Sequence, residues 1–575
     1  MSFQGKILLI FALLSLSSLI HSAAFTPCPI LGPSFPYPKL SLQSELLQSA
    51  LADLTKQYDD MVKTGNSSHG TITPETTSFS IALFAGDGVD NDGDGIKEPF
   101  FYEYHYTAPA LENSSVGVKK VDADSIYRIG GLTQLFTVLL TLIEAGDSLW
   151  SVPVTKLVPE LARAASRLNA KRNPVKYVDW ESVTVGHLTS HMAGIARDCE
   201  SVLPPGAYPP TLPTSPKKDS RKWQRQRAIP TPNHNVIDRI KFVEFFDGFV
   251  HQAPVYLPGT TPVYSNAAFQ ILGYILEDRT GKSFEALLRS KIFKPLRMRH
   301  SSLFGPRDTK NGVVPGGAKK SGWETAFGGG APAQSIFSTV SDLSKAGNAI
   351  LSSSLISPAQ TRRWNKPVSH TSNPANSVGR PWVIYRGGQY QQTVVVYVNT
   401  LLSSLGSYSS YIGIVPDFHV GFTILAADET GSPDLNAHAD IIADALFPAL
   451  MQLAPMQAME RFGGEYGQES SKSSITIAAD RLRGIKEPSA VSIRLYPTDR
   501  ETETRSGSRM AFRAVIQDLN EEADNGTPTC VSWMDVGVLT YGGAALDEVV
   551  FELGKNGKAV GLEVPALRAS LVRLE

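Results

Sequence analysis

Two histidines, His187 and His191, stand four positions apart in the stretch GHLTSHMAG. On a helix this spacing places both imidazoles on one face, which is how zinc metalloproteases hold their metal. In those enzymes a glutamate directly follows the first histidine, whereas here the next residue is Leu188. No cysteine–histidine spacing suggests zinc either, so we expect no metal site and no cofactor.

The loop GDGVDNDGDGIKEP carries Asp90, Asp92 and Asp94 followed by Gly95, which resembles the start of a calcium-binding loop. The twelfth position is Phe101, where an EF-hand requires a bidentate glutamate, and no helices are expected on either side. Glycine and aspartate also favour turns because of their backbone preferences. The pattern therefore favours a polar hairpin turn over a cation site.

Composition restricts the possible partners. The chain has 575 residues, which indicates two or more domains. Its hydrophobic fraction of 42% and charged fraction of 19% are ordinary for a globular protein. A formal net charge of -1 gives no reason to expect a nucleic acid or an acidic membrane surface as a partner.

The N-terminus reads MSFQGKILLIFALLSLSSLIHSAAF, with one lysine before an apolar run over 7–20 and small residues after it. This pattern predicts a signal peptide over residues 1–24, and thus a secreted protein that leaves the membrane after cleavage. A signal anchor that stays in the membrane is the alternative, but the run is short and ends in small residues. We expect no other segment to span a bilayer.

Secretion agrees with three glycosylation sequons, at Asn66, Asn113 and Asn525. The cysteines are Cys28, Cys199 and Cys530, which allow one disulfide and leave one residue over. A bridge between Cys28 and Cys530, joining the two ends of the mature chain, is one hypothesis.

The elements needed to position any site follow from periodicity. The stretch YRIGGLTQLFTVLL reads as the end of a strand, a two-glycine turn and an apolar helix. Tyr102, Tyr104 and Tyr106 alternate along a strand and predict an aromatic packing face, and Trp382 also predicts packing. We further expect an extended segment at 25–40, helices at 42–63 and 435–454, strands at 78–85, 100–109, 393–400 and 410–428, a mostly helical region that includes 183–198 and 266–296, and a basic, proline-rich surface loop at 204–232.

From about residue 460 the pattern changes to short strands separated by turn residues. This predicts a separate antiparallel β-barrel or sandwich of roughly 110 residues. The predicted domains are thus 25–457 and 458–575. The expected strands lie at 473–479, 490–497, 509–517, 531–543, 548–554, 559–565 and 569–575.

Several motifs in one order resemble the serine β-lactamase-like hydrolases, which include class C β-lactamases, D-alanyl-D-alanine peptidases and esterases. They are YRIG with LTQLFTVLLTLIEAG, VGHLTSHMAGI, TPVYSNAAFQILGYILE, FGGGAPAQSIFSTVSDLSKAG, GRPW and GSYSSYIGIVPD, which span most of residues 80–450. The chain looks closest to secreted fungal members that carry a C-terminal β domain. The resemblance implies an α/β (α+β) fold with an antiparallel sheet flanked by helices and a helical subdomain, and a structural role for the stretch around His187.

In that family a serine-x-x-lysine motif begins a helix, where the serine attacks a carbonyl and the lysine takes its proton. At the matching positions this chain has Gly131 and Gln134. Glycine offers no nucleophile and glutamine cannot act as a base. We therefore predict no acyl-enzyme hydrolysis by the family route.

The family's tyrosine-x-asparagine motif is intact as Tyr264-Ser265-Asn266. The resemblance implies proton transfer by Tyr264 and substrate orientation by Asn266, so both are candidate catalytic residues. The third motif, lysine or histidine, any residue, then glycine, is degenerate. One alignment places Asn399 and Leu401 there, and another places Leu401 and Ser403, so the cation is missing in both.

Three hypotheses follow for a chain with this pattern. The first is a secreted pseudo-hydrolase that binds a small molecule without turnover. The second is a repurposed enzyme of small-molecule biosynthesis that uses Tyr264 for proton transfer, cyclisation or isomerisation. The third is residual hydrolase activity through an unrecognised serine, with Ser265 and the serines of 403–410 as possibilities, although none lies in a GxSxG elbow.

Overall fold

A computed structural model describes residues 30–89, 97–198, 245–306, 309–390, 394–468, 474–478, 493–516 and 532–574. The predicted signal peptide, the three cysteines, Asn525, the aspartates of the calcium-like loop and the loop at 204–232 lie outside these residues.

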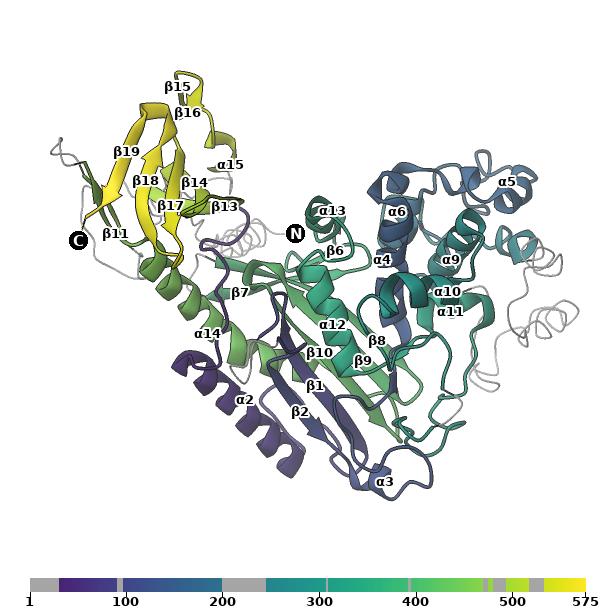
Figure 1. Cartoon of the computed structure of the whole chain (residues 1–575). Helices are drawn as coiled ribbons and strands as arrows, with labels where there is room; N and C mark the ends of the chain where they lie inside the picture. Colours follow the sequence, from purple (N-terminus) through teal and green to yellow (C-terminus); the bar gives the residue numbers. More distant parts are fainter. Residues whose placement is uncertain are drawn as a thin grey trace, which may run out of the picture. The chain divides into compact units, whose positions relative to one another are not determined.

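The chain forms two compact units (Figure 1). The large unit comprises residues 40–387 and 397–446, and the C-terminal unit comprises residues 1–39, 388–396 and 447–575.

An eight-stranded sheet forms the centre of the large unit, with strand order β2-β1-β10-β9-β8-β7-β6-β5. Neighbours pair antiparallel wherever their register is described. The strands β1, β9 and β10 are buried along their whole length, because both faces of the sheet are covered. The bounds are β1 Thr77–Ala85, β2 Tyr102–Tyr106, β5 Ser369–His370, β6 Asn376–Val378, β7 Val383–Tyr390, β8 Val394–Leu405, β9 Tyr408–Val415 and β10 Val420–Asp428.

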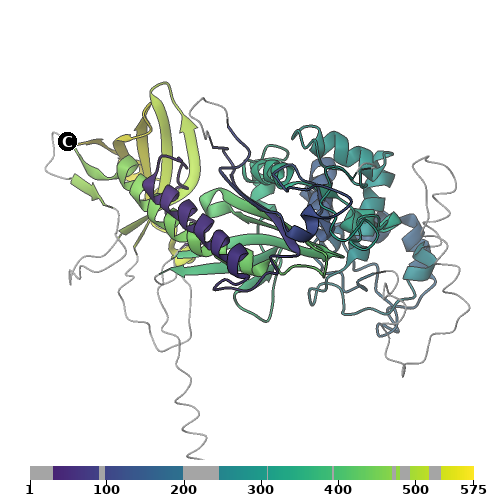
Figure 2. The same cartoon turned by 90° about the horizontal axis from the view of Figure 1, so that it is seen from below.

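One face of this sheet packs against α2 (Glu45–Thr64) and the first part of α14 (Asn436–Phe462), as Figures 1 and 2 show. The Tyr58 ring lies 5.1 Å from Tyr104, and the His438 ring lies 4.7 Å from Phe79. The Tyr104 hydroxyl donates to Asp59 Oδ1 at 2.9 Å. These contacts confirm the predicted packing role of the tyrosines on β2.

The other face of the sheet packs against α12 (Val340–Leu351). Side chains five positions apart on a strand point to opposite faces of the sheet. Phe84 on β1 accordingly points away from Phe79 and packs on Gly347 of α12, where a Cβ atom would collide with the ring. Beyond α12 lies the helical region, which Figure 1 shows beside the sheet. Further helices of the large unit are α4 Thr133–Ala145, α5 Pro159–Ser166, α6 Val185–Thr189, α9 Asn266–Thr280, α10 Phe284–Leu288, α11 Ala331–Gln334 and α13 Pro358–Trp364. The short helix α3 (Pro109–Glu112) follows β2 and lies apart from the helical region.

Within the region predicted to be mostly helical, the stretch 183–198 is helical only in α6. His191 has a φ of 58° and Gly194 has a φ of 64°, both in the left-handed region that ends a helix. The backbone pairs instead with a distant segment, because Gly259 N donates to Met192 O at 2.8 Å and Val263 N donates to His191 O at 2.7 Å.

The main sheet of the C-terminal unit has seven antiparallel strands, in the order β12-β11-β19-β18-β17-β14-β13, and curls into a half-barrel (Figure 1). Its core includes Phe462 and Phe512, whose ring centroids lie 5.1 Å apart. The strands are β11 Gly464–Gly467, β12 Ser474–Ile477, β13 Ile493–Glu503, β14 Gly507–Ile516, β17 Glu548–Gly554, β18 Ala559–Val564 and β19 Ala569–Arg573.

The strand predicted over 531–543 is wrong. That segment contains the short helix α15 (Ser532–Asp535) and the two-residue strand β15 (Thr540–Tyr541), which pairs with β16 (Ala544–Ala545). Gly537 has a φ of 76°, which interrupts any extended run. Trp533 remains 67% exposed, so its apolar surface does not enter the sheet.

By length and composition alone, α14 could cross a membrane, contrary to the expectation that only the N-terminal segment could. Half of its most apolar window is buried within the protein, and it contains Pro448 and Pro455. Its N-terminal half packs on the central sheet through His438. Its first part, with Ala437, Ile441, Ile442 and Leu446 buried, therefore belongs to the core of the large unit.

Candidate active site

The candidate site begins at the junction between β3 (Tyr127–Arg128) and α4. A short 3-10 turn, η1 (Gly130–Leu132), joins them, and Gly130 adopts a φ of 47° that glycine reaches without strain. From Thr133 to Leu142 every residue of α4 is buried, including the polar residues Thr133, Gln134, Thr137 and Thr141. The predicted strand–turn–helix is thus confirmed, and position 131 stands at the start of a central helix.

The junction is anchored on both sides. Ser410 Oγ of β9 donates to Ile129 O at 2.8 Å, and Arg128, which is 1% exposed, donates to Gly322 O and Thr325 O at 2.7 Å each. Burial lowers the pKa of Arg128 to about 10. Arg128 therefore holds a loop in place and does not face a ligand.

Ser403 of β8 fills the space beside Gly131. The Gly131 amide donates to Ser403 Oγ at 2.6 Å. A Cβ atom on residue 131 would lie 2.8 Å from Tyr264 Oη and 3.1 Å from Ser403 Oγ. A larger residue therefore fits at position 131 only if these groups move.

Gln134 lies three residues after Gly131, on the same face of the helix. Its side chain is fully buried. Its Nε2 donates to Tyr264 Oη at 2.8 Å and to Asn266 Oδ1 at 3.1 Å, whereas its Oε1 has no hydrogen-bond partner among the described residues. The structure thus brings together Gly131, Gln134, Tyr264 and Asn266, all of which the sequence singled out.

Tyr264 and Asn266 are positioned by the N-terminus of α9. Ser265 is the N-cap, since its Oγ accepts from Ala268 N at 3.2 Å, and it also donates to Ala196 O at 2.7 Å. Asn266 begins the helix, and its Nδ2 donates to Asp198 Oδ1 at 2.9 Å. Because Ser265 Oγ is occupied in capping, it does not serve as a nucleophile in this arrangement.

The ring of half-buried Tyr264 packs against two charged or chargeable groups. The His191 ring stacks on it at 4.7 Å, and the Arg197 guanidinium lies 4.9 Å from its centroid. Burial raises the pKa of Tyr264 to about 12, although Arg197 and the bond from Gln134 oppose the shift. Tyr264 is therefore a neutral phenol near pH 7.

His191 is neutral as well. Its Nδ1 accepts from Ser265 N at 3.1 Å, so the ring proton resides on Nε2, which is buried without a partner among the described residues. Burial lowers the pKa of His191 to about 4. His187 does not join it, because its Nδ1 faces Thr184 N at 3.4 Å in a capping box. In the described part of the chain no three metal-binding side chains cluster.

The three positions proposed for the degenerate third motif separate. Ser403 faces the site, whereas Leu401 is 3% exposed within the hydrophobic core. Asn399 is 1% exposed, and its Nδ2 donates to Asn365 O at 3.2 Å. Trp382 is fully buried against Trp364 at 5.6 Å, which confirms its packing role.

Sequence reasoning did not select Arg197 or Asp198, and it weighed His191 only as a metal ligand. No spacing in the sequence links residues 191–198 to residues 264–266. The link is tertiary: Arg197 O accepts from Asn266 N at 2.8 Å and from Ala267 N at 3.1 Å.

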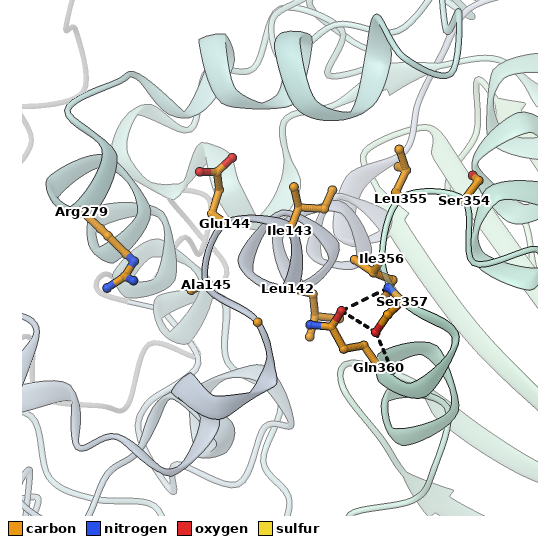
Figure 3. Close-up of a pocket in the computed structure, with 11 residues that line it drawn as sticks. Leu142, Ile143, Glu144, Ala145, Arg279, Ser354, Leu355, Ile356, Ser357 and Gln360 are labelled. Atoms are coloured by element: carbon orange, nitrogen blue, oxygen red, sulfur yellow. Dashed lines mark hydrogen bonds between the residues drawn. The ribbon is translucent and has the colours of Figure 1, made fainter.

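A hollow of about 510 Å³ lies at the opposite end of α4 and contains none of the predicted site residues. Figure 3 shows Gln360 in this hollow, with its side chain bonded to Ser357, the N-cap of α13. Ser357 and Gln360 form the capping box of α13, and Glu144 pairs with Lys291 at 2.9 Å, so we assign this hollow no function. Its lining residues are Leu142, Ile143, Glu144, Ala145, Gly146, Arg279, Ser354, Leu355, Ile356, Ser357 and Gln360.

Comparison with known families gives two matches along the chain. The family described as Beta-lactamase matches residues 104–447. The family described as Beta-lactamase-like-like, C-terminal domain, matches residues 479–575.

Individual proteins match over nearly the whole length. A "Beta-lactamase-like protein" of Arthroderma benhamiae is 26% identical, covering 96% of this chain and 97% of the relative. A "Probable hydrolase M10" of Phoma sp. is 22% identical, covering 99% of this chain and 95% of the relative. Among solved structures, "A class C beta-lactamase" aligns with a TM-score of 0.46 and 15% identity over 71% of this chain and 98% of that chain.

Proposed function

Because the chain belongs to the beta-lactamase family, we propose that it is a member that binds a small molecule without forming an acyl-enzyme. The observation that carries this proposal is the contact between the Gly131 amide and Ser403 Oγ, at 2.6 Å. The Ser403 hydroxyl accepts the hydrogen bond of the amide at the start of α4. In an active member of the family, the attacking serine would stand at this position and the oxyanion would lie beside this amide. The first hypothesis from the sequence is the one we retain.

The chemistry supports this choice. Gly131 has no side chain to attack a carbonyl, and the Gln134 amide can donate hydrogen bonds but cannot remove a proton. In other serine hydrolases the loss of the nucleophile costs roughly a million-fold in turnover. Gln134 still donates hydrogen bonds to Tyr264 at 2.8 Å and to Asn266 at 3.1 Å. It therefore keeps these two side chains in position, although it cannot accept a proton as the family's lysine does.

Labelling with a fluorophosphonate probe tests the proposal. We expect no mass increase on the intact protein and no turnover of chromogenic esters or β-lactams, whereas a known serine hydrolase is labelled in parallel. An adduct on the wild-type protein would contradict the proposal. The Ser403→Ala and Ser265→Ala variants would then show which hydroxyl reacts, and so test residual hydrolysis through another serine.

A second candidate function rests on Tyr264. Because the pKa of this phenol is raised to about 12, it stays protonated near pH 7, so it can donate a hydrogen bond to a bound molecule but is a weaker acid than free tyrosine. Such a group would suit cyclisation or isomerisation of a small molecule without a covalent intermediate. In that case Tyr264→Phe abolishes the reaction, and full activity in the phenylalanine variant would rule the function out.

We also propose that the protein is secreted and glycosylated. The signal-like segment over residues 1–24 and the exposed side chains of Asn66 and Asn113 support this. Expression in a eukaryotic host should give a product in the medium that lacks the leader. Its mass should fall after treatment with an endoglycosidase, and fall less in an Asn66→Gln, Asn113→Gln variant.

A further inference from the structure

The hydrogen bonds that lead from Asp198 to Tyr264 run in one direction. An ionised carboxylate can only accept, so the Asn266 amide must turn its nitrogen toward Asp198, 2.9 Å away. The other atom of that amide, Oδ1, then faces Gln134 at 3.1 Å. An oxygen there requires a donor, so Gln134 must turn its nitrogen toward Asn266.

The same nitrogen also determines the role of the tyrosine. Gln134 Nε2 carries two hydrogens, of which one goes to Asn266 and the other to Tyr264 Oη at 2.8 Å. The tyrosine oxygen is therefore an acceptor within the network, and its own proton must point elsewhere. In the described part of the chain this proton meets no acceptor.

The unpaired oxygen of Gln134 agrees with this direction. Gln134 Oε1 is buried and has no partner among the described residues. Turning the amide over would let Oε1 accept the tyrosine proton, but it would bring two oxygens together at the 3.1 Å contact with Asn266. The network keeps the orientation that leaves Oε1 unpaired because Asp198 fixes Asn266.

We infer that Asp198 is a positioning residue that makes Tyr264 a hydrogen-bond donor to the ligand, so that the site selects molecules that present an acceptor oxygen, such as a carbonyl or an N-oxide. This inference rests on the proposed function, since it concerns the ligand of the same site. Asp198 would thus determine the ligand specificity without touching the ligand, because it acts through Asn266 and Gln134.

Neutron diffraction from crystals of the deuterated protein tests the direction itself. Both deuterons of Gln134 Nε2 should point at Asn266 Oδ1 and Tyr264 Oη, and the Tyr264 deuteron should point away from Gln134. A deuteron of Tyr264 lying between its oxygen and Gln134 would overturn the inference.

A binding experiment on the full mature chain tests the selectivity. Pyridine N-oxide accepts but cannot donate a hydrogen bond, and pyrrole donates through its N–H. Ligand-observed NMR should give a Kd for the N-oxide that is about tenfold lower than that for pyrrole, since one mismatched hydrogen bond is worth about that factor. Equal binding of the two probes, tighter binding of pyrrole, or no saturable N-oxide binding would overturn the inference.

Variants separate positioning from mere structure. Asp198→Asn allows the amides to turn over, so the preference for the N-oxide should shrink toward equality, and Asp198→Glu should restore part of it. Asp60→Asn makes the same chemical change on the exposed face of α2 and should keep the full preference. Tyr264→Phe should remove the preference even if Asp198→Asn folds poorly. Full selectivity in folded Asp198→Asn would overturn the role of Asp198, whereas a fluorophosphonate adduct would instead overturn the proposed function.

Discussion

Two buried histidines of the large unit lie in contrasting surroundings. His191 stacks on Tyr264 at 4.7 Å, and His438 stacks on Tyr58 at 5.7 Å. Burial lowers the pKa of each imidazole to about 4. By burial and ionisation alone, the two groups cannot be distinguished.

Their neighbours make the difference. Around His438 lie Tyr58 and Phe79, both fully buried, and neither ring nitrogen has a hydrogen-bond partner among the described residues. His191 stacks on the half-buried phenol of Tyr264. That phenol also contacts the exposed Arg197 guanidinium and the amide of Gln134, which in turn bonds Asn266. The lowered pKa of His438 therefore results from packing alone. The lowered pKa of His191 accompanies a polar network within reach of solvent.

The largest effect should come from the packing cluster. Tyr58→Ala removes a fully buried ring and its hydroxyl bond to His438 O at 3.1 Å, and should cost about 3–5 kcal/mol of unfolding free energy. Tyr264→Ala removes a half-buried ring and should cost clearly less. Thermal unfolding of the two variants gives the comparison, and equal losses would mean that Tyr264 too is chiefly a packing residue.

Acid should destabilise the protein through both histidines. Their folded-state pKa of about 4 lies below the ordinary 6.5, so the unfolded chain binds protons first as the pH falls. Each neutral histidine contributes about 3 kcal/mol to the free energy of unfolding. This contribution is fully present above pH 6.5 and is lost as the pH falls toward 4. His438→Leu should therefore lose less stability between pH 7 and 4.5 than wild type, as measured by chemical denaturation at each pH. An unchanged acid dependence would contradict the buried neutral state of His438.

A methyl group at position 131 should probe the crowding in the site. Gly131→Ala places a Cβ 2.8 Å from Tyr264 Oη and should cost about 1–3 kcal/mol. Because Tyr264→Phe removes that oxygen, the same substitution should cost less in its background. Gly431→Ala, where nothing lies within 4 Å, serves as the control and should change stability by under about 0.5 kcal/mol. Equal costs at the two glycines would show that the space beside Gly131 is open.

The smallest effect should come from Arg197. Its side chain is 70% exposed, so the loss of its contact with the Tyr264 ring in Arg197→Gln should cost less than about 1 kcal/mol. Since Arg197 opposes the rise in the pKa of Tyr264, the variant should also raise that pKa further. Melting curves at low and high salt provide the check, because salt screens an exposed charge. A large, salt-independent loss would indicate a structural role instead.

Most of the fold could be predicted from periodicity. The strands β1, β9, β10, β17 and β18 and the helices α2, α4 and α9 lie where alternation or helical spacing placed them. The failures share one cause, which is that apolar runs do not reveal left-handed residues that break them. Left-handed His191 follows the end of α6 inside the region predicted to be mostly helical, and Gly537 interrupted the predicted strand over 531–543.

The candidate site was predictable to the extent that its motifs are local. The junction around Gly131, the spacing to Gln134 and the start of α9 at Asn266 each follow from a short stretch of sequence. Ser403 was one of several equivalent positions, and only the register that pairs it with Ser410 turns it toward the junction.

The sequence alone therefore determined which chemical groups this protein has at the start of its central helix, and that a serine and a lysine are not among them. Only the tertiary structure decided what fills their place: a hydroxyl from β8 on the Gly131 amide, and a carboxylate at residue 198 that orients the amides beside Tyr264. The reason is physical, because hydrogen bonds of this kind join residues about 70 to 270 positions apart, and their direction depends on atoms that meet only after folding.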